Sequence, residues 1–332
     1  MLTAVSAHRL PAGATAYTYK LKDGTSFENV APPAGFNYAR ASSALLSELN
    51  LPPRPTGAAA MKAWEAQVAP FSKSKISRSE KFCEMPAAPE PEAAAMGQRT
   101  LNVSPFGSVG HSGSKSFSGY ELRSGPYHRA VGHFVQPSTG GTFDRLMSTW
   151  IGLNSNAGSA GRLVQAGSGN ELYGGGSPFW ELYCSGGSAD GCNGPVLDQN
   201  TFAAPGDTVS INVAYNGPTA YFQVAINGAL DINATDPMKS GSETGGVADF
   251  WTERTAGDNI PPSSNIVWSA SRTYASYSGS TSVPFGSQNY FATEMTTDGN
   301  FYTSSGCANT HILMYPSNVS SGGFVNNYCR SS

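Results

Sequence analysis

The 332-residue sequence has few charged side chains and no long apolar run. Asp, Glu, Lys and Arg together make up only 13% of it, about half the usual share. Gly (38) and Pro (22) are abundant, and aromatic residues reach 11%. A coiled coil or a bundle of long helices needs more charge and more Leu, so this composition excludes those classes. The composition instead predicts an all-β protein with many turns.

Several signatures of binding and catalysis are also missing. No run of about 18 apolar residues is present, so no membrane partner is expected. The net charge of −3 and the pI near 6.0 exclude a general phosphate footprint, so no nucleic-acid partner is expected. The sequence contains no Gly-x-Ser-x-Gly elbow, P-loop or HExxH motif. Among five histidines only His128 and His133 are close, and no acidic residue follows at metal-motif spacing, so neither metal nor cofactor is expected.

Cysteine is scarce, and its spacing is informative. Cys83 stands alone, Cys184 and Cys192 are eight residues apart, and Cys307 and Cys329 are 22 apart. An even set of four predicts two local disulfides and therefore an oxidising compartment. A zinc site is the alternative, but no Cys-x-x-Cys occurs.

Three glycosylation sequons, which begin at Asn102, Asn233 and Asn318, also fit secretion. No convincing signal-peptide core follows Met1. We therefore expect a secreted protein whose signal is absent from this sequence.

Charge is distributed unevenly along the chain. Residues 1–115 hold 12 Lys and Arg and 8 Asp and Glu (+4), whereas residues 116–332 hold 8 and 15 (−7), with Lys239 as the only lysine. Residues 72–116 are rich in Ser, Lys, Pro and Ala, as exposed linkers are. We therefore divide the chain into a basic segment (1–71), a linker (72–116) and an acidic body (117–332).

The basic segment and the body differ in periodicity. Residues 41–50 and 58–69 predict two short helices, because their apolar residues recur at helical spacing and prolines follow. In the body, residues 209–215 and 220–226 alternate at period two around Asn216-Gly217, which predicts a hairpin. Short strands continue to the C-terminus. The fold class expected is an antiparallel two-sheet β-sandwich, preceded by a small mixed segment with short helices.

Polar side chains recur on otherwise aromatic strands. Alternation places Trp150 with Asn154, and Gln165 with Leu163, each pair on one strand face. It also places Glu181 with Phe179 and Tyr183, and Glu253 with Trp251 and Asp249. Carboxylates and an amide among aromatic residues predict a substrate groove, although a solvated sheet face has similar patterning.

Five segments resemble, in order, those of the glutamic peptidases of the eqolisin family: WIGLN (150–154), VQAG (164–167), FWELY (179–183), PGDTV (205–209) and ADFWTE (248–253). The family has Trp-Val-Gly-Ile/Leu-Asp, then Leu-Gln-x-Gly, then Trp-Tyr-Glu-Trp-Tyr, then a Gly-Asp-Thr/Ser strand and Ala-Glu-Phe/Trp-Ile-Val/Ile-Glu. The match covers residues 115–260 well. The basic segment resembles the propeptides of bacterial members.

The resemblance implies a lectin-like or glucanase-like sandwich and an acid endopeptidase made as a zymogen. Its catalytic pair would be Gln165 and Glu253. Glu253 would activate the attacking water, and Gln165 would stabilise the oxyanion. The groove residues implied are Trp150, Asn154, Phe179, Glu181, Tyr183 and Trp251. The partners expected are protein or peptide substrates and the chain's own propeptide as intramolecular inhibitor, and a monomer is expected.

The sequence departs from the family pattern at several positions. Asn154 replaces an aspartate, Phe117 and Phe179 replace tryptophans, and Arg254 follows Glu253 where an acid is usual. Two alternatives stay open. A neprosin-like peptidase would use two catalytic glutamates. A lectin-like sandwich without catalysis would bind glycans or peptides.

The charge asymmetry suggests how a zymogen would be held. At neutral pH the positively charged front part of the chain (residues 1–115) would lie over an acidic groove of the body, with Lys73, Lys75, Arg78 and Lys81 as contacts. Acid would protonate the carboxylates of the body and weaken that attraction.

Overall fold

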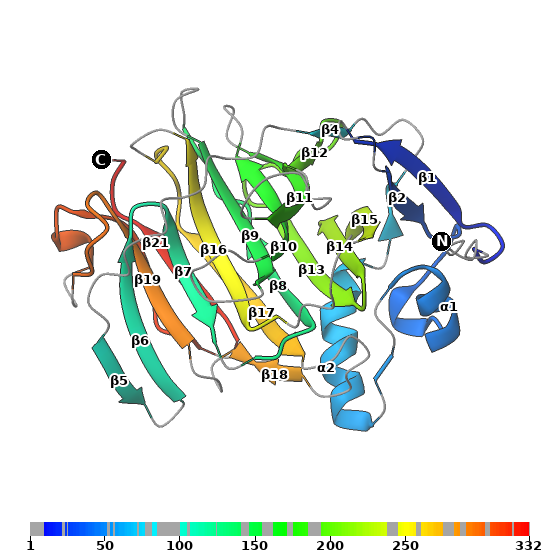
Figure 1. Cartoon of the computed structure of the whole chain (residues 1–332), viewed down its shortest axis with the longest axis horizontal. Helices are drawn as coiled ribbons and strands as arrows, with labels where there is room; N and C mark the ends of the chain where they lie inside the picture. Colours follow the sequence, from blue (N-terminus) through cyan, green and yellow to red (C-terminus); the bar gives the residue numbers. More distant parts are fainter. Residues whose placement is uncertain are drawn as a thin grey trace.

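The computed structural model confirms an all-β fold, in which the strands of the described residues form one continuous sheet of 21 strands (Figure 1). The described residues are 10–21, 24, 26–51, 54–55, 57–71, 73–76, 82–84, 100–104, 107–123, 125–140, 146–154, 162–170, 175–184, 194–237, 245–256, 260–274, 282–285, 290–302, 306–320 and 322–331. No helix among them is long and apolar enough to cross a membrane.

The continuous sheet folds into two layers, which we call the front sheet and the back sheet. The front sheet runs, in order of pairing, through β4 (Phe82–Glu84), β12 (Val196–Asp198), β11 (Gly176–Cys184), β10 (Arg162–Asn170), β9 (Leu146–Asn154), β16 (Val247–Ala256), β7 (Phe117–Leu122), β19 (Tyr290–Thr296) and β6 (Gly107–Ser114), with β5 (Thr100–Ser104) beside β6.

The back sheet runs through β20 (Ile312–Pro316), β21 (Phe324–Tyr328), β17 (Ile266–Tyr274), β8 (Arg129–Val135), β13 (Thr208–Asn216), β14 (Thr219–Ile226) and β15 (Ala229–Pro237), and β18 (Ser282–Pro284) pairs with β17. β19 also pairs with β20, so the two sheets are continuous along one side and the sandwich approaches a barrel.

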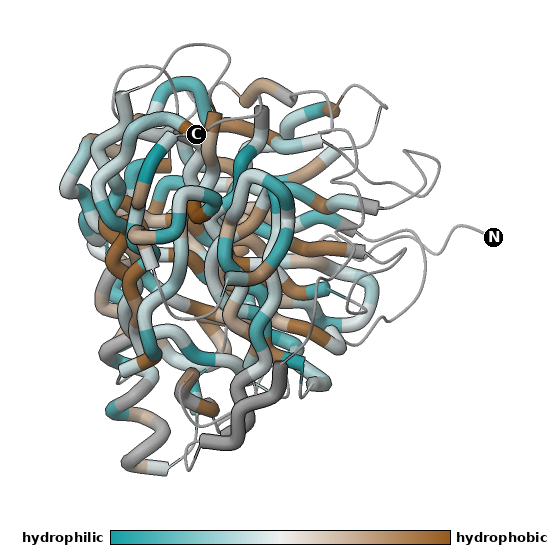
Figure 2. Tube along the Cα trace, turned by 90° about the vertical axis from the view of Figure 1, so that its left-hand side faces the viewer, coloured by the Kyte–Doolittle hydropathy of each residue, from teal (hydrophilic) through white to brown (hydrophobic). Residues whose placement is uncertain are grey.

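The main core lies between the two sheets. It includes Ile151 and Trp180 from the front sheet, and Ile211 and Phe222 from the back sheet, all almost completely buried. Hydrophobic and hydrophilic residues are interspersed along the chain trace, as Figure 2 shows. Because alternate residues of a strand face opposite sides, the front sheet keeps a second, outer face.

The predicted hairpin and helices are confirmed. β13 and β14 pair around Gly217, whose φ of 58° suits the glycine of the Asn-Gly turn. The helices are α1 (Ser43–Glu48), which begins after the Ser42 cap, and α2 (Ala58–Val68), with 3-10 turns at Tyr38–Arg40, Ala69–Phe71 and Gly306–Ala308.

The N-terminal segment, by which we mean the described residues between 10 and 84, is built into both sheets. β2 (Ser26–Ala31), which pairs with β1 (Thr15–Lys20), and β3 (Lys73–Ser74) join β15, while β4 joins β12. Residues 100–104 and 107–114, which composition assigned to the linker, form β5 and β6 at the other edge of the front sheet. The Gly- and Ser-rich sequence of β6 does not predict a strand. The strand forms through parallel pairing with β19, which is distant in sequence.

The helices of this segment cover the outer face of the back sheet. Leu46, Leu49 and Trp64 are buried there against Ala225 and Leu230. A polar contact adds to this packing, because Asn233 Nδ2 donates to the backbone oxygens of Val30 (3.0 Å) and Leu49 (3.1 Å). The helices and the outer face of the front sheet therefore lie on opposite sides of the main core.

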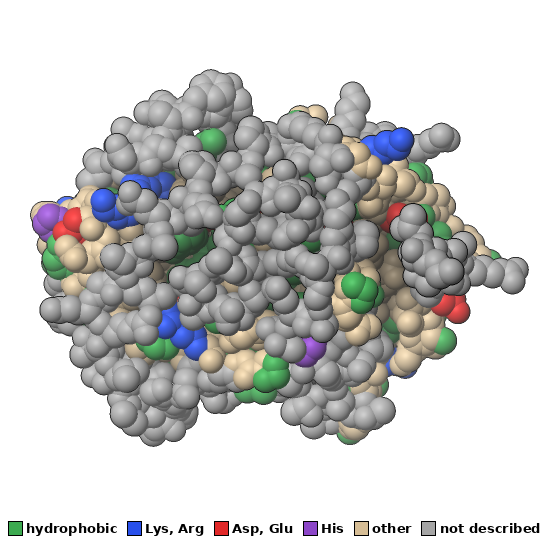
Figure 3. Space-filling view, in the orientation of Figure 1, with side chains coloured by type: hydrophobic (Ala, Val, Ile, Leu, Met, Phe, Trp, Pro, Cys, Tyr) green, Lys and Arg blue, Asp and Glu red, His purple; other side chains and the backbone are tan. Residues whose placement is uncertain are grey.

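The predicted contact with the acidic groove is wrong for Lys73 and Lys75, the two of the four basic residues that are described. Lys73 and Lys75 are exposed and lie beside β15 of the back sheet, where the charge of Lys75 acts on Asp231. Arg78 and Lys81 lie outside the described residues. In Figure 3 the charged side chains of the described residues are scattered over the visible face, in keeping with the low charge content.

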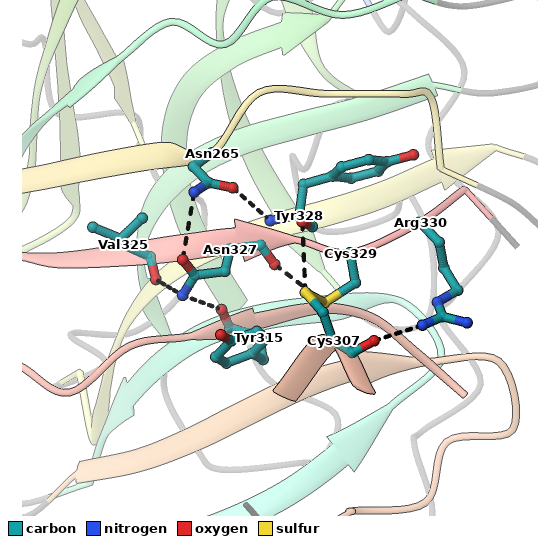
Figure 4. Close-up of a disulfide and its surroundings, with 8 residues drawn as sticks. All are labelled: Asn265, Cys307, Tyr315, Val325, Asn327, Tyr328, Cys329 and Arg330. Carbon is teal, nitrogen blue, oxygen red and sulfur yellow. Dashed lines mark hydrogen bonds between the residues drawn. A yellow bond between two sulfur atoms is a disulfide. The ribbon is translucent and has the colours of Figure 1, made fainter. Parts of the chain in front are cut away.

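One of the two predicted disulfides is confirmed. Cys307 and Cys329 are bonded, with Cα atoms 5.0 Å apart, and the Arg330 guanidinium donates to the Cys307 carbonyl oxygen (Figure 4). Cys192 and the side chain of Cys184 lie outside the described residues, so their pairing stays a prediction.

Candidate active site

Two rows of side chains cross the outer face of the front sheet, because residues opposite each other on paired strands share a face. The acid row consists of Glu121 on β7, Asp249 on β16, Gly152 on β9, Gln165 on β10 and Glu181 on β11. The tryptophan row, two residues along, consists of Gly119, Trp251, Trp150, Gly167 and Phe179. Glu253 lies one row further, opposite Ser148 and Phe117.

Both predicted catalytic residues therefore face the same side, together with all six predicted groove residues. Alternation at period two established which residues of each strand share a face. The pairing register, which a sequence does not specify, then places the strands so that these faces coincide.

Gln165 and Glu181 form a hydrogen-bonded pair. They are opposite each other on β10 and β11, and Gln165 Nε2 contacts Glu181 Oε2 at hydrogen-bonding distance. Both side chains are buried, with 6% and 4% of their surface exposed. Burial raises the pKa of Glu181 to about 8; the bond from Gln165 lowers it, and the nearby Glu253 carboxylate raises it further.

Glu253 is held by Trp150. The indole Nε1 of Trp150 donates to Glu253 Oε2 at 2.8 Å. Burial raises the pKa of Glu253 to about 7, and the hydrogen bond from Trp150 opposes that rise by stabilising the carboxylate. The electrostatic effect of Glu253 on Glu181 ties this pair to the Gln165–Glu181 pair. Four polar groups from four strands thus form one cluster.

Aromatic rings surround the cluster. Trp150, Phe179 and Trp251 form a separate hydrophobic group, against which Phe117 packs with its ring centroid 5.8 Å from that of Trp251. Gly167 stands opposite Trp150, and a Cβ there would lie 2.2 Å from the Thr149 carbonyl oxygen, so only glycine fits. The replacement of two tryptophans by Phe117 and Phe179 keeps an aromatic ring at each position.

Asn154 and Tyr183 lie at the end of this face. Both are opposite Leu163 of β10 and are half-buried. Asn154 occupies the place where the family pattern has an aspartate, so this end of the face carries one potential negative charge fewer. These two residues are more accessible than the tryptophans, which are 3% and 6% exposed.

A further acidic group was missed by sequence reasoning. Glu121 stands opposite Asp249, and Arg123 pairs with Glu121, its Nη2 lying 3.0 Å from Oε2. The Arg123 guanidinium also lies over the ring of Phe291, with its Cζ atom 3.9 Å from the ring centroid. Burial and the Glu121 charge raise the pKa of Asp249. The alternation of Phe117, Gly119 and Glu121 indicated a shared face, but the pairing of β7 with β16 could not be foreseen.

No cluster of three or more His, Cys, Asp or Glu side chains suited to a metal ion occurs among the described residues. His133 is buried in β8 of the back sheet, which is remote from the acid row in pairing order.

Comparisons with known proteins give structural similarities only. A scan against protein-family models finds no match, and a search of curated proteins finds none. Among solved structures, the chain is similar to scytalido-glutamic peptidase with a transition-state analogue inhibitor, at 14% identity and a TM-score of 0.48, over 64% of this chain and 98% of that one. It is also similar to SCP-B, a member of the eqolisin family of peptidases in complex with the tripeptide Ala-Ile-His, at 13% identity and a TM-score of 0.41, over the same shares.

Proposed function

We propose that this protein is a glutamic endopeptidase, with Glu253 as general base and Gln165 as oxyanion donor. The observation that carries the proposal is the cluster itself. A carboxyl held by an indole N–H and a buried amide bonded to a second carboxyl share one aromatic sheet face. The segments that contribute these residues are also those that resemble the eqolisins.

The chemistry follows from the two side chains. Hydrolysis of a peptide requires a base to take a proton from water and a donor to stabilise the oxyanion that forms on the carbonyl. Glu253 takes the proton and passes it to the leaving amine. Gln165 offers a neutral N–H that is available at every pH. The aromatic rings bind the flanking parts of an extended peptide.

The burial of the site supports a closed, inactive form of the full chain. Trp150, Trp251 and Gln165 are all less than a tenth exposed, so a substrate cannot reach them without an opening of this face. Burial is also the main reason why the pKa of Glu253 is about 7, and a protonated Glu253 cannot act as a base in acid. Opening hydrates the carboxyl and returns its pKa toward the ordinary value, about 4.3 for Glu. Activity at acid pH therefore depends on opening.

We propose that opening follows proteolytic processing within residues 72–116, as in an acid-activated, secreted zymogen. The disulfide supports an oxidising compartment. The contacts of the N-terminal segment with the back sheet indicate that its described part does not inhibit by occupying the outer face of the front sheet.

Acid activation tests the proposal. Purified full-length protein is brought to about pH 4, near the carboxyl reference value, and followed by gel, N-terminal sequencing and casein hydrolysis. Wild type should be cut within residues 72–116 and should then digest casein. Glu253→Gln and Gln165→Ala should stay intact unless active wild type is added. A wild-type chain that binds peptide or glycan without cutting either itself or casein would instead identify a non-catalytic module.

The electrostatic contact between Glu181 and Glu253 favours one second candidate, a mechanism with two catalytic glutamates. In that mechanism Glu181 has to ionise or transfer a proton, so Glu181→Gln should be as inactive as Glu253→Gln.

A further inference from the structure

The amide of Gln165 is only half satisfied. Its Nε2 faces the Glu181 carboxyl, but no described group donates a hydrogen bond to its Oε1, which is buried. Buried polar atoms in folded proteins are nearly always paired, so an orphaned carbonyl oxygen beside the reacting cluster needs an explanation.

The arrangement also conflicts with the proposed role of Gln165. When Nε2 donates to Glu181, the other side of the amide presents the lone pairs of Oε1 to its surroundings. An oxyanion needs N–H donors, and a carbonyl oxygen facing it would repel it. One of the two amide protons would meanwhile be occupied by Glu181.

A half-turn of the amide removes both problems if Glu181 carries a proton. The oxygen and nitrogen of a glutamine amide are nearly identical in shape, and their assignment follows from the hydrogen bonds available. An ionised carboxylate only accepts, so it selects the orientation with Nε2 toward it. A protonated carboxyl donates, so it selects the orientation with Oε1 toward it.

We infer that Glu181 is a positioning residue that acts in its protonated form, donating its O–H to Gln165 Oε1 and turning the Gln165 Nε2 hydrogens toward the substrate. This inference rests on the proposed function of Gln165 as oxyanion donor. The reaction then requires the two carboxyls in opposite protonation states, with Glu181 protonated while Glu253 is ionised.

The surroundings of Glu181 favour the protonated form. From β10 it meets the neutral amide of Gln165, and from β9 the same row presents Gly152. The acid that acts on it is Glu253 of β16, through its charge. On its own strand the nearest titratable side chain of this face is Tyr183. No cation acts on Glu181 among the described residues, and burial raises its pKa to about 8.

The conservative variant Glu181→Gln separates this role from others, because its amide can donate to Gln165 Oε1 at every pH. After processing, kcat/KM of Glu181→Gln should stay within about threefold of wild type in acid and should lose the alkaline limb that belongs to Glu181. Glu181→Ala removes the donor, and its kcat should fall about 100-fold with little change in KM, as expected for a misdirected oxyanion donor.

A readout without turnover uses the inactive Glu253→Gln background. The side-chain amide resonances of Gln165, assigned by their loss in Gln165→Ala, should follow a titration of Glu181 that is absent from Glu253→Gln/Glu181→Gln. Thermal unfolding of each variant checks that it is folded.

The results separate the possible failures. An inactive but folded Glu181→Gln, or a Glu181→Ala with the wild-type profile, would overturn the inference while leaving the peptidase assignment in place. If wild type itself cuts no peptide, the proposed function fails, and the amide titration still tests the pairing of Glu181 with Gln165.

Discussion

The hydrogen bond from Trp150 to Glu253 sets the charge state of the proposed base, and Trp150→Phe tests this link. The substitution keeps an aromatic ring in the cluster but removes the Nε1–H donor, which lies 2.8 Å from Glu253 Oε2, together with part of the indole ring system. A donor to a charged group contributes about 1.5–3 kcal/mol. At about 1.4 kcal/mol per unit, its loss should raise the pKa of Glu253 by about one to two units.

The expected kinetic effect follows from the sign of that shift. Glu253 has to be ionised to act as a base, so the acid limb of kcat/KM should move up by about one to two pH units in the processed enzyme. At a fixed pH below the limb, kcat/KM should be about 10–100-fold lower than in wild type. The assay is a pH series with an internally quenched peptide.

Trp251→Phe is the matched control. It removes the same kind of donor from the same aromatic cluster, but its side chain interacts with Asp249 rather than Glu253. Its acid limb should therefore stay in place. An unmoved limb in Trp150→Phe, or equal movement in both variants, would refute the coupling of Trp150 to the base.

Two further predictions concern stability and modification. Burial raises the folded-state pKa values of Glu181 and Glu253 to about 8 and about 7, so their stabilisation is complete below their unfolded values and is lost as pH rises. Burial lowers the pKa of His133 to about 4, so His133 changes the stability with pH only below its ordinary pKa of 6.5. Between about pH 6.5 and 8.5 Glu181 and Glu253 together should thus lower the free energy of unfolding by on the order of 3 kcal/mol, measured by denaturant titration, and Glu181→Gln should flatten the curve. In a glycosylating host, mass spectrometry should find sugar on the exposed Asn318 and none on Asn233, which is completely buried; glycan on Asn233 would contradict the packing of the N-terminal segment.

Local patterns in the sequence were sufficient to predict which residues share one face of a strand. Period-two alternation placed Trp150 with Asn154 and Glu253 with Trp251, and the structure keeps both pairs on one face. These predictions succeed because the direction of a side chain in a strand depends only on its parity.

Long-range pairing was not predictable from the same patterns. The contact of Trp150 with Glu253, the opposition of Glu121 and Asp249, and the entry of β4 into the front sheet each depend on strands distant in sequence. A shift of one residue in the pairing register would move every side chain of a strand to the opposite side of the sheet, and the sequence of a single strand does not specify that register.

The positions of Lys73 and Lys75 show a related limit. Their positive charge suggested a contact with the acidic cluster, but net charge does not specify which sheet a segment joins. The short parallel pairing of β3 with β15 determines their place instead.

The central claim is that Glu253 is the base of a peptide hydrolysis, and the most direct measurement is the kcat/KM of Glu253→Gln after processing in trans by immobilised wild type. This design separates catalysis from the failure of self-processing. We predict a fall of about 100- to 10,000-fold, the usual contribution of a general base, with the unfolding midpoint preserved. A processed, folded Glu253→Gln that cleaves peptide at the wild-type rate would contradict the account.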